Sequence, residues 1–464
     1  MANLILWTSM HREYAAVRTV AAYQLASWLR KHGYTVKVID FCHMMTTEEL
    51  VTITEKYIGP ETIAIGVSST FWQDFEAVLN RFLEPTWVLN ARKEIESRHK
   101  LYWLLGGGAA TRGRKNNTWI TFPGYAEDSL LQWMDNNSSK FRKRDLFDIQ
   151  SSKNGFVEDD FIRPFEVLPM ELGRGCQFKC SFCSFPLIGK KKGTYIRDLE
   201  LIKAELLENY EKWGLTRYYF VDDTVNESEE KVYAMAELAQ SLPFKLEWVG
   251  YNRLDLIWSR PGTIKALKDS GLRSAFFGVE SFHPEAARAV GKGWMGKKSK
   301  DFILDLKKEW NDEITWKIAL IVGLPGENEE SIIETHNWCR DNEMYEWNFG
   351  PLYITRDPGK VWKSQFETEY EKFGYSFANP TTDHWKNEHF TFARAVELSK
   401  RLSSEAKANY TMPTAFDLGQ NVGLGYSFDE MLLVKRKDLP LNEFTVRQNA
   451  IAREYIDYQI NISI

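Results

Sequence analysis

Three cysteines, Cys176, Cys180 and Cys183, stand in a C-x-x-x-C-x-x-C frame within eight residues of the chain. They follow a mostly apolar run, residues 165–172, that predicts a β-strand. Iron–sulfur clusters are held by about four thiolates. Three closely spaced cysteines can therefore hold three irons of a 4Fe–4S cluster and leave the fourth iron open to a substrate or cofactor. The spacing predicts a strand that leads into a loop at which a cluster performs chemistry.

Zinc and disulfides are the alternative uses of these cysteines. Structural zinc needs four protein ligands, usually in two separated pairs. The other cysteines, Cys42 and Cys339, lie far away and unpaired in the sequence, and no histidine is near the loop. Five cysteines in 464 residues are too few for a disulfide framework, and their number is odd. The cluster is the favoured interpretation, with zinc as the weaker one.

The residues around the cysteines resemble those of a known family. Phe182 directly before Cys183 is typical of the radical S-adenosylmethionine (SAM) superfamily, and the wider pattern E-L-x-R-G-C-x-x-x-C-x-F-C resembles its cobalamin-binding branch. The resemblance covers most of the chain. It implies three cofactors, which are a 4Fe–4S cluster, SAM and cobalamin.

Composition restricts the class of protein. A hydrophobic content of 44% and a charged content of 27% are ordinary for a globular protein with two or three domains. Nucleic-acid-binding proteins usually carry an excess of basic residues, whereas this chain has a net charge of −5. We therefore expect no nucleic-acid partner. The chain opens without a basic leader and has no apolar run of about 18 residues, which predicts no signal peptide, no membrane span and a cytoplasmic location.

Residues 1–135 alternate short apolar runs with helical patterns. A helix is expected over residues 15–31, and strands over residues 4–7, 34–41, 62–67 and 101–105. This alternation predicts an α/β domain with a parallel, doubly wound, Rossmann-like sheet. Ligands of such sheets bind at the carboxyl ends of the strands. The candidate binding residues at these ends are Ser9, His11, Ser68, Ser69, Gly106, Gly107 and Gly108.

The resemblance assigns this domain to cobalamin. It implies that the glycines after the fourth strand let the nucleotide tail of the cofactor lie against the backbone. Gly124 and Glu127, at the ends of G-Y-A-E, resemble the G-E-G-E segment of the same domain. Many cobalamin proteins carry a D-x-H-x-x-G motif. Of its three fixed positions, this chain has only the histidine, His11. We therefore expect cobalamin to bind without a histidine ligand from the protein.

A polar stretch, residues 136–163, is expected to be a linker, and strand–helix alternation resumes over residues 164–352. The resemblance implies that this second region is a partial (β/α)6 radical SAM barrel. Strands are expected over residues 165–172, 217–222, 245–252, 274–280, 315–323 and 347–353, and helices over residues 198–213, 228–241, 261–270, 298–310 and 329–342.

Barrel enzymes place their chemistry at the carboxyl ends of the strands. The candidate SAM-binding residues at these ends are Phe182, Asp222, Asp223, Arg253, Glu280, Gly323 and Leu324. Carboxylates such as Glu280 can accept hydrogen bonds from ribose hydroxyls or the SAM ammonium. Arg253 can donate two parallel hydrogen bonds to the SAM carboxylate. The backbone at Phe182 and at Gly323 can bracket the adenine. The alternatives are a helix cap at Asp223, a lysine partner for Glu280 and a simple turn at Gly323.

Residues 353–464 are expected to be mainly helical, with an amphipathic helix over residues 390–408. We expect this region to close the barrel mouth and to shape the substrate pocket. Trp347, Tyr353, Trp362 and Trp385 are candidates to line that pocket, although core packing is the usual role of such side chains.

The favoured function is that of a cobalamin-dependent radical SAM methyltransferase. The resemblance implies that a 5′-deoxyadenosyl radical activates an unactivated carbon and that methylcobalamin delivers the methyl group. The implied partners are a small-molecule or peptide substrate and an external one-electron reductant of the flavodoxin or ferredoxin type. Two alternatives remain, namely radical cyclisation, rearrangement or oxidation without methyl transfer, and a non-catalytic electron carrier or redox sensor.

Overall fold

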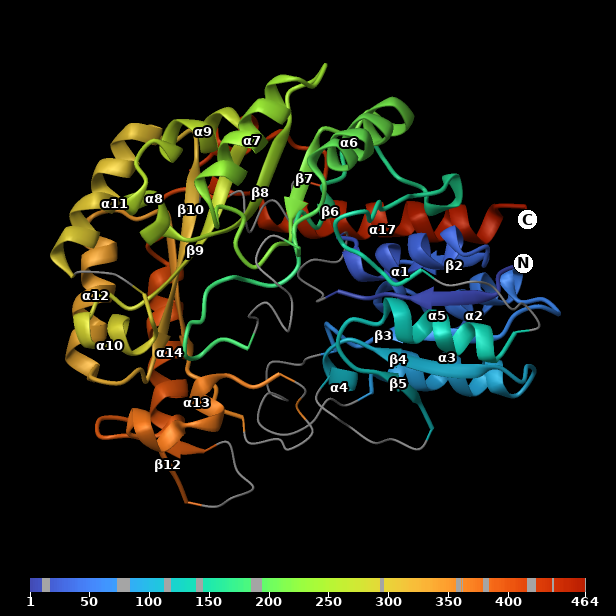
Figure 1. The fold of residues 1–464 in the computed structure, drawn as a ribbon, viewed down its shortest axis with the longest axis horizontal. Helices are drawn as coiled ribbons and strands as arrows, with labels where there is room; N and C mark the ends of the chain where they lie inside the picture. The colour runs from blue at the N-terminus through green and yellow to red at the C-terminus, as the bar shows by residue number, and fades with distance from the viewer. Residues whose placement is uncertain are drawn as a thin grey trace.

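The computed structural model describes residues 1–10, 17–72, 84–111, 118–138, 145–184, 194–292, 296–355, 360, 362–378, 384–414, 423–435 and 438–463. Within this part of the chain, two parallel sheets and their helices lie side by side (Figure 1). The α/β class with parallel sheets that the sequence predicts is confirmed. None of the helices described is both long and apolar enough to span a bilayer.

The first sheet has the order β2-β1-β3-β4-β5, and all of its strands are parallel. Its strands are β1 (Leu4–Trp7), β2 (Val36–Ile39), β3 (Ala64–Ser68), β4 (Tyr102–Gly106) and β5 (Ile120–Phe122). Its helices are α1 (Val20–Lys31), α2 (Thr47–Tyr57), α3 (Thr86–Glu96), α4 (Gly108–Thr111) and α5 (Glu127–Asn136). The order reverses between β1 and β3, which is where a doubly wound sheet opens a crevice at its carboxyl edge.

Alternate residues of β1 face opposite layers of this domain. Leu4 and Leu6 belong to the core that contains α1 and α5, whereas Ile5 and Trp7 belong to the core that contains α2 and α3. All four residues of β1 are buried. Burial on both faces explains why this strand is a continuous apolar run rather than an alternating one.

The second sheet is built in simple sequence order, β11-β10-β9-β8-β7-β6, and is parallel throughout. Its strands are β6 (Leu168–Met170), β7 (Arg217–Phe220), β8 (Glu247–Asn252), β9 (Leu272–Glu280), β10 (Thr315–Val322) and β11 (Glu346–Pro351). Its helices are α6 (Leu199–Trp213), α7 (Glu229–Gln240), α8 (Leu254–Ser259), α9 (Thr263–Asp269), α10 (Pro284–Ala289), α11 (Lys297–Trp310) and α12 (Glu329–Asp341). The helices follow the outer side of the curved sheet (Figure 1).

The chain after β11 divides between the two sheets. Its regular elements are α13 (Gln365–Thr368), β12 (Ser376–Phe377), β13 (Trp385–Lys386), α14 (Phe392–Lys407), α16 (Phe428–Leu433) and α17 (Leu441–Asn461). Short 3-10 helices are η2 (Cys42–Met44), η4 (Glu158–Asp160) and η5 (Tyr370–Phe373). Helix α14 packs along β11, but α17 packs on α2 of the first domain, with Tyr455 and Ile456 in that domain's core. The last helix therefore differs from the expectation that this whole region closes the barrel.

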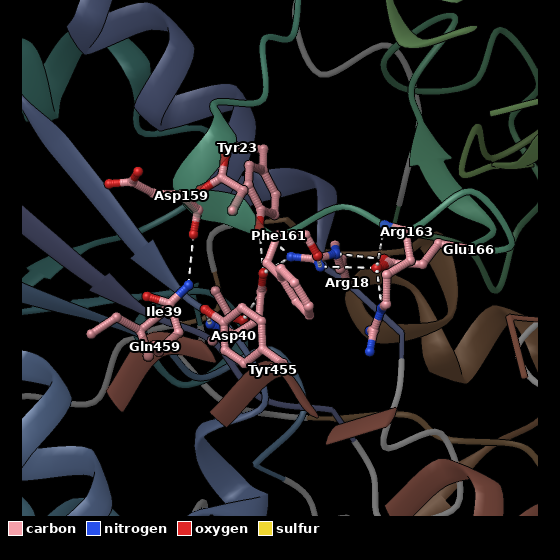
Figure 2. Close-up of polar contacts among 12 residues, drawn as sticks. Arg18, Tyr23, Ile39, Asp40, Asp159, Phe161, Arg163, Glu166, Tyr455 and Gln459 are labelled. Carbon is pink, nitrogen blue, oxygen red and sulfur yellow. Dashed lines mark hydrogen bonds and ion pairs between the residues drawn. The ribbon is translucent and has the colours of Figure 1, made fainter. Parts of the chain in front are cut away.

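A buried polar network joins the two domains and the last helix. Figure 2 shows Arg18 between Asp40 of the first domain and Glu166, just before β6. The Arg18 guanidinium donates to Asp40 at 2.7 Å and to Glu166 at 2.6 Å and 3.0 Å. The backbone N–H of Asp40 donates to the Tyr455 hydroxyl of α17 at 3.0 Å. Arg163 adds a second cation to Glu166 at 3.0 Å, so both carboxylates are paired.

We expect Arg18→Ala to lower the free energy of unfolding by about 3–5 kcal/mol, because it leaves two buried carboxylates without their shared cation. Burial alone raises the pKa of Glu166, but Arg18 and Arg163 outweigh it and the net pKa lies below the ordinary value of 4.5. This stabilisation is therefore complete above that ordinary value and disappears as the pH falls through the lower folded pKa. Urea unfolding at neutral and acidic pH measures both effects.

A matched control for this substitution is Arg453→Ala. Arg453 also joins α17 to the first domain, through Glu49 at 2.6 Å, but its side chain is 44% exposed. An exposed pair of this kind contributes about 0–1 kcal/mol. Equal losses of stability in the two variants would contradict the role assigned to the buried network.

Candidate functional site

The cysteine loop follows β6 and is held against two distant segments. Cys176, Cys180 and Cys183 are all half-buried. The N–H of Ser181 donates to the carbonyl of Val290 after α10 at 3.2 Å, and the Ser181 carbonyl accepts the N–H of Phe366 in α13 at 3.0 Å. The loop is thus positioned at the carboxyl edge of the second sheet by backbone hydrogen bonds on both sides.

The donor set of this loop fits a cluster. Cys176 Sγ lies 3.5 Å from the Thr224 hydroxyl, and Cys180 Sγ lies 3.4 Å from Nη1 of Arg253. Burial raises the pKa of the Cys176 thiol, and a bound metal deprotonates such a thiol outright. Across the described ranges, no three His, Cys, Asp or Glu side chains converge on a point that one metal ion could occupy. A cubane-type 4Fe–4S cluster does not need the cysteines to converge on one point, because each cysteine binds a different iron.

The two adjacent aspartates after β7 have different surroundings. Asp222 is buried, accepts the N–H of Leu172 at 2.6 Å and pairs with Lys231 at 2.9 Å, so it ties β7 to the chain just before the cysteines. Asp223, by contrast, is exposed. The pKa of Asp223 is raised to about 7. The main cause is that the surrounding protein excludes water from its carboxyl group, and the negative charges of Asp222 and other nearby carboxylates add to this. Of the two predicted residues, Asp223 is the one that can accept a hydrogen bond from a ligand.

Glu280, the last residue of β9, is held by a lysine. It pairs with Lys292 at 2.8 Å, and Lys292 also donates to the carbonyl of Gly278. The backbone of Glu280 has φ of +66°, a conformation that is costly for a side-chain-bearing residue and concentrates at functional sites. The lysine partner considered in the sequence is present, and the SAM contact of Glu280 stays a prediction.

The turn after β10 is built around Gly323. Its φ is +100°, and a Cβ there would lie 2.3 Å from the buried Trp385 ring. The Gly323 carbonyl already accepts the Tyr375 hydroxyl at 2.8 Å and the Asn387 amide at 3.1 Å. Leu324 is fully buried, so its side chain belongs to the core. Any contact of this turn with adenine must therefore use the remaining backbone groups.

The aromatic candidates of the barrel and the C-terminal region have mixed roles. Trp347 and Trp385 are core residues. The ring N–H of Trp347 donates to His336 at 3.2 Å, and the ring N–H of Trp385 donates to the Leu352 carbonyl at 2.9 Å. Phe182 is partly buried against the main core. Tyr353 is 44% exposed.

A cavity of about 640 Å³ lies between the carboxyl edge of the first sheet and the cysteine loop. Its volume is typical of small-molecule and cofactor sites. Predicted cobalamin-binding residues in its wall are Ser68, Gly106, Gly107, Gly108, Gly124 and Glu127. Barrel residues in the same wall are Glu171, Arg174, Ser184 and Val221, and the C-terminal region adds Lys360 and Trp362.

Two further predicted residues of the first domain, Ser9 and Ser69, are not among the described residues that line this cavity. Ser9 is buried, and Ser69 is buried with its hydroxyl donating to the Gly106 carbonyl at 2.6 Å. His11 lies outside the described residues. Ser69 therefore stabilises the end of β4 rather than facing a ligand.

Two glycines at the end of β4, Gly106 and Gly107, have separate reasons to lack a side chain. Among the residues that the structure describes, no atom lies within 4 Å of a Cβ built on Gly106, which borders the cavity. Gly107 has φ of +84°, and a Cβ there would lie 2.5 Å from the Thr70 hydroxyl. Gly107 is thus required by the turn, whereas Gly106 leaves space that a ligand can fill.

Arg174, which was not a predicted site residue, connects the two halves of the cavity. It donates to Glu127 at the start of α5 at 2.7 Å and to Glu171 at 2.8 Å. Its guanidinium also lies 4.4 Å from the centre of the Tyr125 ring, and Tyr125 packs on Trp362 at 5.3 Å. Arg174 belongs to the quoted E-L-x-R-G-C pattern, but the sequence has no signal for partners 47 residues away.

The chain was compared with known proteins. Residues 170–339 match the family model described as the radical SAM superfamily. An uncharacterized methyltransferase of Pyrococcus horikoshii is 23% identical over 68% of this chain and 72% of the relative. A ribosomal protein uS12 methylthiotransferase, RimO, of Synechocystis is 28% identical over 35% of this chain and spans 37% of that relative.

A solved structure has a similar fold over nearly the whole chain. It is the radical SAM methyltransferase TsrM from Kitasatospora setae with cobalamin and a 4Fe–4S cluster bound. The TM-score is 0.61 at 14% identity, with 98% of this chain and 100% of that chain covered. The family match around the three cysteines, together with the methyltransferase relative, shows that this chain is an enzyme that contains a radical SAM domain over residues 170–339.

Proposed function

We propose that this enzyme is a cobalamin-dependent radical SAM methyltransferase that acts on an unactivated carbon of a small-molecule or peptide substrate. One observation carries the proposal. A single cavity is bordered on one side by the glycine-rich strand ends of the first sheet and on the other by Ser184, which directly follows Cys183. A cofactor in the first domain would therefore face the cysteine loop across one shared space.

Residues that line the cavity, and others near it at the strand ends of the second sheet, have identifiable tasks. Cys176, Cys180 and Cys183 would hold three irons, and Asp223 would accept a hydrogen bond from the SAM ammonium or ribose. Gly106 would let a cobalamin tail lie against β4, because no atom of the described residues lies within 4 Å of its built Cβ. Bound there, the cluster would supply an electron to SAM and cobalamin would carry the methyl group.

Arg174 would hold the two cofactor-binding parts in a fixed relation. Its ion pairs with Glu127 and Glu171 are both largely buried, so they resist exchange with water. Burial by itself lowers the pKa of Arg174, but the two carboxylates outweigh it, so the guanidinium stays charged. The electron would come from a reductant of the flavodoxin or ferredoxin type.

Product analysis tests the function. Protein loaded anaerobically with iron, sulfide and cobalamin and given dithionite and SAM should form S-adenosylhomocysteine, and this product should be lost when cobalamin is omitted. With a competent substrate, 5′-deoxyadenosine should appear as well. Deoxyadenosine without S-adenosylhomocysteine, with cobalamin bound, would favour cyclisation, rearrangement or oxidation. An intact cluster without either product, under reductants of several potentials, would favour an electron carrier.

A further inference from the structure

The guanidinium of Arg253 is aimed at a cysteine sulfur. Arg253 directly follows β8 and is only 7% exposed. Nη1 lies 3.4 Å from Cys180 Sγ, while Nε and Nη2 donate to the two carboxylate oxygens of Asp255 at 3.0 Å and 2.6 Å. We expected two N–H groups of Arg253 to bind the SAM carboxylate. Nε and Nη2 bind Asp255 instead, and Nη1 is directed to the Cys180 sulfur.

Two further residues, Asn226 and Phe178, fix the position of this donor. The backbone N–H of Arg253 donates to Asn226 Oδ1 at 2.8 Å, and the Arg253 carbonyl accepts the Asn226 amide at 2.9 Å. The Phe178 ring lies 4.2 Å from the guanidinium carbon. Phe178 belongs to the cysteine loop itself, so the guanidinium contacts this loop both at the ring and at the sulfur. A side chain held this firmly makes its sulfur contact without losing further rotamer freedom.

Hydrogen bonds to ligand sulfurs, net charge and solvent exposure set the reduction potential of iron–sulfur clusters. Reduction adds negative charge to the cluster and its thiolates. A cationic N–H donor on one thiolate stabilises the reduced form more than the oxidised form. The contact therefore favours acceptance of an electron.

We propose that Arg253 is a positioning residue that raises the reduction potential of the cluster through its hydrogen bond to the Cys180 thiolate. This inference rests on the proposed function, because it requires a cluster on the three cysteines. It differs from a SAM-binding role, in which Arg253 would affect SAM affinity and leave the potential of the SAM-free cluster unchanged.

The test is the midpoint potential of the reconstituted, SAM-free cluster, measured by redox titration with electron paramagnetic resonance. Arg253→Met should keep its iron and shift the midpoint to a more negative value. Arg253→Gln, which keeps a neutral N–H donor, should shift it less. Iron content and the brown charge-transfer absorbance are recorded for each variant, so that loss of the cluster is distinguished from a change in its potential.

Arg273→Met is the matched control. Arg273 also pairs with carboxylates, Asp429 and Glu247, and lies over an aromatic ring, Phe428, but it is near the start of β9, at the opposite edge of the sheet. Its midpoint should equal that of the wild type. An unchanged midpoint in Arg253→Met would overturn the inference, as would loss of iron in both Arg253 variants, which would make Arg253 a requirement for assembly. A wild-type protein without a cluster would overturn the proposed function as well.

Discussion

Replacing Cys176, Cys180 or Cys183 singly with Ala should reduce the iron content from about four per chain to nearly none, because each cysteine would hold a separate iron and two thiolates would not retain a cubane. All three residues lie in one loop after β6 and are half-buried rather than packed in the core. Their loss should therefore leave the fold intact. Iron and sulfide analysis after anaerobic reconstitution measures the effect, with circular dichroism as the check on folding.

The two other cysteines provide the control for this experiment. Cys42 and Cys339 are fully buried, and burial raises the pKa of both thiols, as in inert core cysteines. Cys42→Ala and Cys339→Ala should each keep about four irons per chain, as the three-ligand cluster implies. A comparable loss of iron in either control would show that the ligand set is wrong.

A bulky side chain at Gly106 should exclude cobalamin. Gly106 ends β4, borders the cavity and has no atom within 4 Å of a Cβ built there. Phe at this position can thus project into the cavity without a backbone clash, so Gly106→Phe should reduce bound cobalamin from about one per chain to nearly none. The cluster should be retained. Absorbance spectroscopy after removal of unbound cobalamin provides the measurement.

Gly350→Phe is the matched control, since Gly350 lies in β11 and also has no atom within 4 Å of a built Cβ. It does not line the cavity. This variant should bind cobalamin like the wild type. Full binding by Gly106→Phe would mean that the cofactor does not occupy the cavity beside β4.

Much of the barrel could be predicted because its elements carry local signals. A strand was expected over residues 315–323 and is observed at Thr315–Val322, and the next helix was expected to begin at residue 329 and does so. Asn328 supplies a side-chain cap to that helix, which marks its start in the sequence. Elements without such signals were missed, among them β5 with three residues and α8 with six.

The site was harder to predict, because its partners are set by the tertiary fold. The cysteines and the glycines at the cavity were identified from their spacing and from their places at strand ends. Nothing local indicates that Arg174 meets Glu127, or that Tyr455 meets Asp40 from 415 residues away. Arg253 was assigned to SAM by its charge, whereas the competing carboxylate of Asp255 is only two residues distant. The charge and the sequence position of a residue identify it as a candidate for the site, but its role depends on the residues that it contacts in the fold.

The most direct test of the central claim is the iron and cobalt content of the same sample of wild-type protein. The protein is reconstituted anaerobically with iron, sulfide and hydroxocobalamin and freed of unbound cofactors before elemental analysis. One cavity between the strand ends and the cysteine loop predicts about four irons and about one cobalt per chain. Iron without cobalt would contradict the proposal that this cavity holds cobalamin opposite the cluster.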